Sequence, residues 1–127
     1  MFLLEIGKDF SFVSEQFRVQ VGNFDFFIDL LFYHRGLSCL VAFELKTTSF
    51  KPDYIDKIIF YLEALDRDHR KDNENPSVGA TLCADKDDEV VEYALQRNLS
   101  PVLIAEYTAK LPYKKFLQSK LHELMEY

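Results

Sequence analysis

The stretch Ile28–Lys46, IDLLFYHRGLSCLVAFELK, combines two apolar runs with three charged side chains that an apolar core does not accommodate. The two runs are rich in β-branched and aromatic residues, and the polar segment HRGLS separates them. This pattern predicts a β-hairpin. Asp29 interrupts the first strand, and Glu44 and Lys46 interrupt the end of the second, so the charges need a structural or chemical reason.

The expected register of the hairpin places two of these charges together. A turn over residues 35–38 would pair His34 with Cys39, and counting back along both strands then puts Asp29 opposite Glu44. Two carboxylates that face each other at about 5 Å repel and weaken the sheet. The pair therefore predicts a bound cation.

A hard divalent ion such as Mg²⁺ prefers a few carboxylates, backbone carbonyls, waters and phosphate oxygens. Asp29, Glu44 and the carbonyl of Leu45 offer such a set of metal ligands. Lys46 shares a strand face with Glu44, and it would orient or deprotonate an attacking water beside a phosphate. The trio Asp29, Glu44 and Lys46 predicts a phosphodiester hydrolase. A structural salt bridge between Lys46 and one of the two acids, with no metal, is the alternative.

The whole chain is compatible with a single domain over residues 1–127. It has 48% hydrophobic and 28% charged residues, and both cysteines, Cys39 and Cys83, sit inside apolar runs that predict core packing. No signal peptide and no apolar run near the ~20 residues of a membrane helix are found, which predicts a cytoplasmic protein without membrane contact. The net charge of −6 counts against a strong nucleic-acid binder, although carboxylates gathered around a metal add negative charge.

The hydrophobic period switches from two to 3.6 after the hairpin, which predicts α/β architecture. Strands are expected over residues 15–21, 26–33, 39–45, 78–84 and 101–107, and helices over residues 2–8, 53–66, 85–98 and 114–126. The order is α-β-β-β-α-β-α-β-α. An antiparallel meander followed by strand-helix alternation predicts a mixed β-sheet flanked by helices on both faces.

An acid at the end of one hairpin strand and an acid-x-Lys on the next resemble the signature of the PD-(D/E)XK nuclease superfamily. Four segments, DFFIDLLFYHRGLSCLVAFELK, FKPDYIDKIIFYLEALD, ENPSVGATLCADKDDEVVEYAL and AEYTAKLP, are similar in order to the C-terminal nuclease domain of the YhcG family of bacterial proteins. The resemblance implies a restriction-endonuclease-like core, endonuclease cleavage of DNA with Mg²⁺ or Mn²⁺, and an N-terminal domain in the full-length protein. It implies that Asp29 and Glu44 are metal ligands and that Lys46 is the catalytic lysine.

Further positions follow from the same resemblance. Glu5 lies where superfamily members often place a helix acid that reaches the metal through water, and a surface glutamate is the alternative. Gln16 is a second accessory position. Family relatives commonly have Gln and then Tyr four residues later, where this chain has Lys57 and Tyr61 on one helix face. A lysine can contact a phosphate or neutralise a site carboxylate but lacks the paired contacts of an amide, and a solvated Lys57 beside a half-buried Tyr61 is the alternative.

Basic side chains that could contact the DNA backbone are Lys51, Arg67, Arg70 and Lys71, with a solvated loop as the alternative. The three histidines, His34, His69 and His122, share no metal-ligand spacing and are expected at the surface. Two other functions stay open: a non-catalytic module that binds DNA or protein, and a phosphatase of small nucleotides. One active site makes one nick, so double-strand cutting would favour a homodimer.

Overall fold

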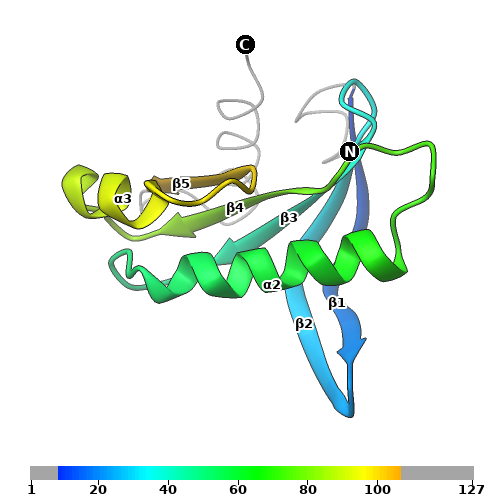
Figure 1. Cartoon of the computed structure of the whole chain (residues 1–127), viewed down its shortest axis with the longest axis horizontal. Helices are drawn as coiled ribbons and strands as arrows, with labels where there is room; N and C mark the ends of the chain where they lie inside the picture. Colours follow the sequence, from blue (N-terminus) through cyan, green and yellow to red (C-terminus); the bar gives the residue numbers. More distant parts are fainter. Residues whose placement is uncertain (1–8, 107–127) are drawn as a thin grey trace.

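The computed structural model describes residues 9–106, which form a five-stranded sheet and two helices (Figure 1). The elements are β1 (Phe10–Val21), β2 (Phe24–His34), β3 (Cys39–Leu45), α2 (Asp53–Asp68), β4 (Val78–Cys83), α3 (Asp88–Leu95) and β5 (Val102–Glu106). The sheet order is β1-β2-β3-β4-β5, antiparallel from β1 to β3 and parallel from β3 to β5. The predicted mixed α/β sheet is confirmed. The helices expected over residues 2–8 and 114–126 lie outside the described residues.

The β2–β3 hairpin has the predicted register. Residues 35–38 form the turn, and the strands pair from His34 opposite Cys39 to Leu30 opposite Phe43. The next position along the two strands brings Asp29 to the level of Glu44. The charged pair therefore lies where the regular ladder stops.

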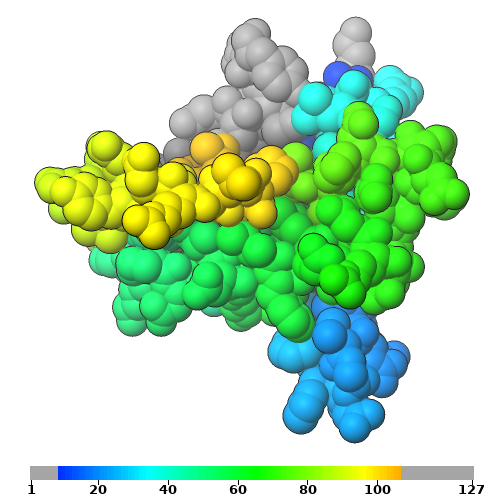
Figure 2. Space-filling model, viewed as in Figure 1, coloured from blue at the N-terminus to red at the C-terminus, as the bar shows by residue number. Residues whose placement is uncertain are grey.

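The β1–β2 hairpin changes its orientation beside this point. Its strands turn at Gly22, whose positive φ of 62° suits the first central position of a type II′ turn. Ile28 and Leu31 both pack toward α2 although they are three residues apart, which a regular strand of period two does not allow. The ladder lacks a pair between Gln16 and Asp29, and Gln16 has a φ of 47°. The strands therefore twist sharply at this pair, and the hairpin end projects past α2 (Figures 1 and 2).

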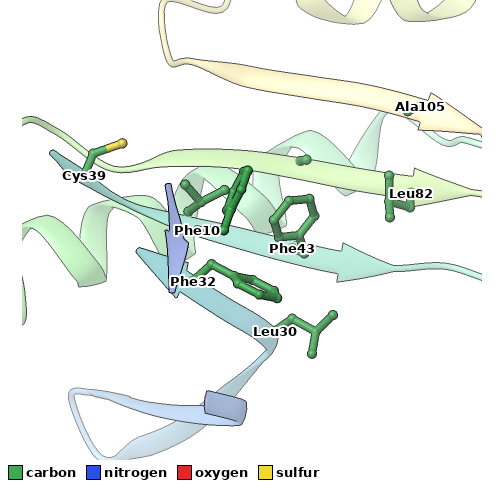
Figure 3. Packing of buried hydrophobic residues seen from close by; sticks show 9 residues of the cluster. Phe10, Leu30, Phe32, Cys39, Phe43, Leu82 and Ala105 are labelled. Carbon is green, nitrogen blue, oxygen red and sulfur yellow. The ribbon is translucent and has the colours of Figure 1, made fainter. Parts of the chain in front are cut away.

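Both described helices pack on one face of the sheet. Ile58, Leu62 and Leu65 of α2 contact Leu31 and Ala42 of the sheet. A neighbouring cluster on the same face includes Ile55 of α2, Cys83 of β4, Ile104 of β5, and Val91 and Leu95 of α3. The opposite face carries Phe10, Leu30, Phe32, Phe43 and Leu82 (Figure 3). Within residues 9–106, no helix packs on this face, so the expected helices on both faces are seen on one face only.

Three expectations need correction. β1 begins at Phe10 instead of residue 15, because an irregularity between Phe12 and Ser14 hides its alternation. The third predicted helix is shorter: it begins after Asp87, which caps α3 by accepting hydrogen bonds from the Glu89 and Val90 N–H groups, and it ends at Leu95. His34 is not a surface residue. It is 4% exposed, because it pairs with the unforeseen start of β1 and packs edge-on against Phe10 at 4.8 Å.

Both cysteines are buried, as predicted. Among residues 9–106, no helix is long and apolar enough to cross a membrane.

Candidate active site

Asp29 and Glu44 are held together by two hydrogen bonds that cross between β2 and β3. The Asp29 N–H donates to Glu44 Oε2 at 2.9 Å, and the Leu45 N–H donates to Asp29 Oδ2 at 2.8 Å. These bonds take the place of the backbone ladder, which ends one residue earlier. A backbone N–H orients a carboxylate and favours its charged form. Each acid thus has one oxygen held by the main chain and one oxygen turned to other partners.

Glu44 is a buried carboxylate, only 2% exposed. Burial raises its pKa, the hydrogen bond from Asp29 lowers it, the charge of Asp29 raises it again, and the ammonium groups of Lys57 and Lys46 lower it, with burial the largest influence. The pKa of Glu44 consequently lies above its ordinary value. A buried acid next to a second acid is costly unless a cation is near.

The nearby cation in the described structure is Lys57. Its Nζ lies 3.5 Å from Glu44 Oε1 and 5.9 Å from the centroid of the Tyr61 ring. Burial lowers the pKa of Lys57, but Glu44, together with Tyr61 and Lys46, outweighs it, so this pKa lies above the ordinary value. Tyr61 is 3% exposed instead of half-buried, and its pKa is raised by burial and then by Glu44. The i, i+4 spacing therefore brings both side chains to the acid pair.

Lys46 follows β3 directly and is anchored by its backbone N–H, which donates to the Leu82 carbonyl at 2.8 Å. Its ammonium lies over the ring of Tyr54, 4.9 Å from the centroid. Within residues 9–106, no ion pair joins Lys46 to Asp29 or Glu44, and Lys57 has the place that the salt-bridge alternative assigned to Lys46. Sequence reasoning missed Tyr54, whose only signal was its place in the first turn of α2.

Gln16 comes to the site from β1. Its Nε2 donates to Asp29 Oδ1 at 3.2 Å, at the point where Gln16 itself adopts a positive φ. Counting back from the turn after Val21 places Gln16 opposite Asp29, a signal that the sequence contains. Glu5 lies outside the described residues.

The basic side chains divide between the two ends of α2. Lys51 is exposed just before the helix, on the side of Lys57. Arg67, Arg70 and Lys71 lie at or beyond the opposite end, and a helix of 16 residues is about 24 Å long. Arg67 forms an ion pair with Glu63, and Arg70 lies 3.9 Å from Asp66. The structure therefore does not bring these three residues to the acid pair.

The donor set suits a hard cation better than zinc. The described part of the chain has no group of three or more His, Cys, Asp or Glu side chains placed to hold a metal ion. Mg²⁺ commonly uses one or two carboxylates and completes its shell with water and phosphate oxygens, whereas zinc sites use three or four protein ligands. Asp29 Oδ1 and Glu44 Oε1 meet the side chains of Gln16 and Lys57, which can move away. The residues fit a magnesium-like ion.

The chain is similar to known proteins in sequence and in fold. A family model described as "YhcG PDDEXK nuclease domain" matches residues 1–122. The chain is 38% identical over 120 residues to "Putative nuclease YhcG" of Escherichia coli (strain K12). The match covers 94% of this chain and 32% of that protein, so the chain spans about a third of the relative's length.

The fold has a counterpart among solved structures. A repair endonuclease from Pyrococcus abyssi superposes with a TM-score of 0.56 at 10% identity, over 83% of this chain and 41% of that chain. This likeness supports the restriction-endonuclease-like sheet and carries no residue roles. The family model and the sequence identity together show that this chain belongs to the YhcG family of PD-(D/E)XK nuclease domains.

Proposed function

We propose that this domain is a Mg²⁺-dependent endonuclease that hydrolyses DNA phosphodiester bonds, with Asp29 and Glu44 as metal ligands and Lys46 as the catalytic lysine. The family match supports nuclease activity. The observation that carries the assignment is the crossed pair of hydrogen bonds between Asp29, Glu44 and the backbone of Leu45. A buried carboxylate such as Glu44 beside a second, partly exposed carboxylate such as Asp29 is rare as a purely structural feature, because their repulsion must be compensated.

The backbone prepares both acids for a cation. The N–H groups of Asp29 and Leu45 hold one oxygen of each carboxylate, so Asp29 Oδ1 and Glu44 Oε1 are the oxygens available to an ion. In a strand, the N–H and C=O of one residue point to the same edge. The Leu45 carbonyl is therefore expected on the Asp29 side as a third ligand. A divalent ion there would stabilise charge on the phosphate and lower the pKa of a bound water.

Lys46 would act on the proton of the attacking water and on the charge of the phosphate. It lies two residues after Glu44, directly beyond β3, and a four-carbon stem lets its Nζ swing from the ring of Tyr54. Lys51 and Lys57 flank the same end of α2 and would contact the backbone phosphates nearest the cut. Arg67, Arg70 and Lys71 would contact the DNA backbone farther away, and a homodimer would place two such sites on one duplex.

The test is cleavage of supercoiled, linear, single-stranded and branched DNA by the purified protein with Mg²⁺, Mn²⁺ or EDTA. The wild type is compared with Lys46→Ala and with Lys86→Ala, which removes a partly buried lysine paired with Asp88. We expect metal-dependent cutting that Lys46→Ala lowers by about a hundredfold or more and Lys86→Ala leaves unchanged.

Each alternative has its own result in this experiment. Failure to cut any substrate, with no stabilisation by Mn²⁺, would contradict the proposal and favour a non-catalytic binding module. Hydrolysis of mononucleotides with indifference to DNA length would favour a phosphatase.

A further inference from the structure

The carboxylate of Glu44 already has a cationic partner. Its Oε2 accepts the Asp29 N–H, and its Oε1 lies 3.5 Å from the Nζ of Lys57. The second oxygen is the one through which Glu44 would bind an ion. Lys57 and a divalent ion therefore compete for the same atom.

Lys57 can leave this position without disturbing the core. Its side chain is 47% exposed, whereas that of Glu44 is 3% exposed. It lines a hollow of about 400 Å³ between α2 and the β1–β2 hairpin, together with Phe26, Asp56, Phe60 and Tyr61. An ammonium displaced from Glu44 thus has open space beside it and water to solvate it.

We propose that Lys57 occupies Glu44 in the metal-free protein and has to leave it before a divalent ion binds, so that this lysine sets the metal affinity of the site. The inference rests on the proposed function, because it takes Glu44 as a metal ligand. Lys57 is then a positioning residue: it keeps the buried acid charged and oriented while no metal is present. The ammonium of Lys57, 3.5 Å from Glu44 Oε1, would also repel a cation that approaches this oxygen.

The first test is calorimetric titration of the protein with Mn²⁺ alone, without DNA. Lys57→Met keeps the apolar stem beside Tyr61 and removes the charge, and Lys57→Gln removes the charge with a polar side chain. Lys51→Met is the matched control, since Lys51 is an exposed lysine that forms no ion pair within residues 9–106. We expect both Lys57 variants to bind Mn²⁺ about two- to fivefold more tightly than the wild type, the effect of a partly exposed ion pair, and Lys51→Met to bind as the wild type does.

The two Lys57 variants separate charge removal from a gained ligand. Tighter binding by Lys57→Gln but not by Lys57→Met would mean that the new amide coordinates the ion, and it would overturn competition by Lys57. Equal Mn²⁺ affinity of the wild type and Lys57→Met would also overturn the inference while leaving the proposed nuclease intact. Failure of the wild type to bind Mn²⁺ and to cleave DNA would contradict the proposed metal site itself.

The second test uses no metal. Urea unfolding in EDTA of the wild type, Lys57→Met, Glu44→Gln and the double variant measures the coupling between the two side chains. We expect Lys57→Met to unfold at lower urea than the wild type, and to lose this defect when Glu44 is also neutralised. Additive effects of the two substitutions would contradict an ion pair in the metal-free protein.

Discussion

The main chain of Asp29 and the carboxylate of Glu44 form a hydrogen bond of 2.9 Å across the β2–β3 pair, one residue beyond the last regular pair of the ladder. Asp29 returns the contact by accepting the Leu45 N–H at 2.8 Å. The side chains thus satisfy backbone groups that the ladder leaves open, and the sheet itself fixes the spacing of the two acids. The backbone hydrogen bonds therefore determine the geometry of the site, and the carboxylates supply its negative charge.

Substitution of Asp29 by Asn tests this distinction between geometry and charge. An asparagine can still accept the Leu45 N–H through Oδ1, so we expect an unchanged fold and a small change in stability. Loss of the charge should lower metal-dependent cleavage at least as much as the roughly 10- to 100-fold loss seen when metal-site partners are removed. Asp25→Asn is the control, because Asp25 lies on the same strand and pairs with Arg18 at 3.1 Å. Full activity of Asp29→Asn in a DNA cleavage assay would contradict a role in metal binding.

Gln16 combines a strained backbone with a contact to Asp29, and two substitutions separate them. Gln16→Gly and Gln16→Ala both remove the 3.2 Å hydrogen bond to Asp29, so both should lower cleavage, by about tenfold. Only glycine adopts the φ of 47° without strain, so Gln16→Gly should be about 1 kcal/mol more stable than Gln16→Ala. Urea unfolding measures the difference. Wild-type cleavage by both variants would leave Gln16 with a backbone role only.

Glu44 should give the metal-free protein a characteristic dependence on pH. Burial raises the folded-state pKa of this carboxyl above the unfolded value near 4.5, so the folded protein binds the proton more tightly than the unfolded chain. Its contribution to stability is therefore complete below pH 4.5 and is lost as the pH rises through the raised pKa. Melting temperatures measured in EDTA over a series of pH values check this. Glu44→Gln should abolish the fall in stability with rising pH, whereas Glu63→Gln on the surface of α2 should retain it.

Mn²⁺ should act in the opposite sense on the same group. It binds the ionised carboxylate, so its stabilising effect should grow over the pH interval in which Glu44 loses its proton. If the stabilisation by Mn²⁺ changes with pH in the same way in the wild type and in Glu44→Gln, a group other than Glu44 is responsible for the pH dependence.

Gly79 determines how closely α2 approaches the sheet. A Cβ at this position would lie 2.6 Å from Cγ1 of Ile58, a side chain that is fully buried. We expect Gly79→Ala to lower the free energy of unfolding by about 1–3 kcal/mol, as overpacking does. Adding Ile58→Ala should make the combined loss smaller than the sum of the two single losses, as measured by chemical unfolding. A neutral Gly79→Ala would mean that α2 can shift away from β4 at no cost.

The sequence by itself determined the hairpin at the centre of the fold. Its turn and its two strands lie within one short stretch, so the polar segment sets the register and the register sets Asp29 opposite Glu44. The helix expected over residues 53–66, observed as Asp53–Asp68, and the parallel strands also followed from local hydrophobic periodicity. Local pattern failed at β1, where the irregularity after Phe12 masks the alternation, and with it the burial of His34 was missed.

Only the tertiary structure decided how the acids are surrounded. Lys57 reaches Glu44 because α2 packs across the sheet, in contact with β1, β3, β4 and β5. Gln16 reaches Asp29 because the β1–β2 hairpin twists at that pair. Helical spacing placed Lys57 and Tyr61 on one face but could not say which strand residue that face meets. That choice depends on apolar packing across many residues, including the close approach of Gly79 to Ile58, and packing of this kind is not encoded in any single stretch of the chain.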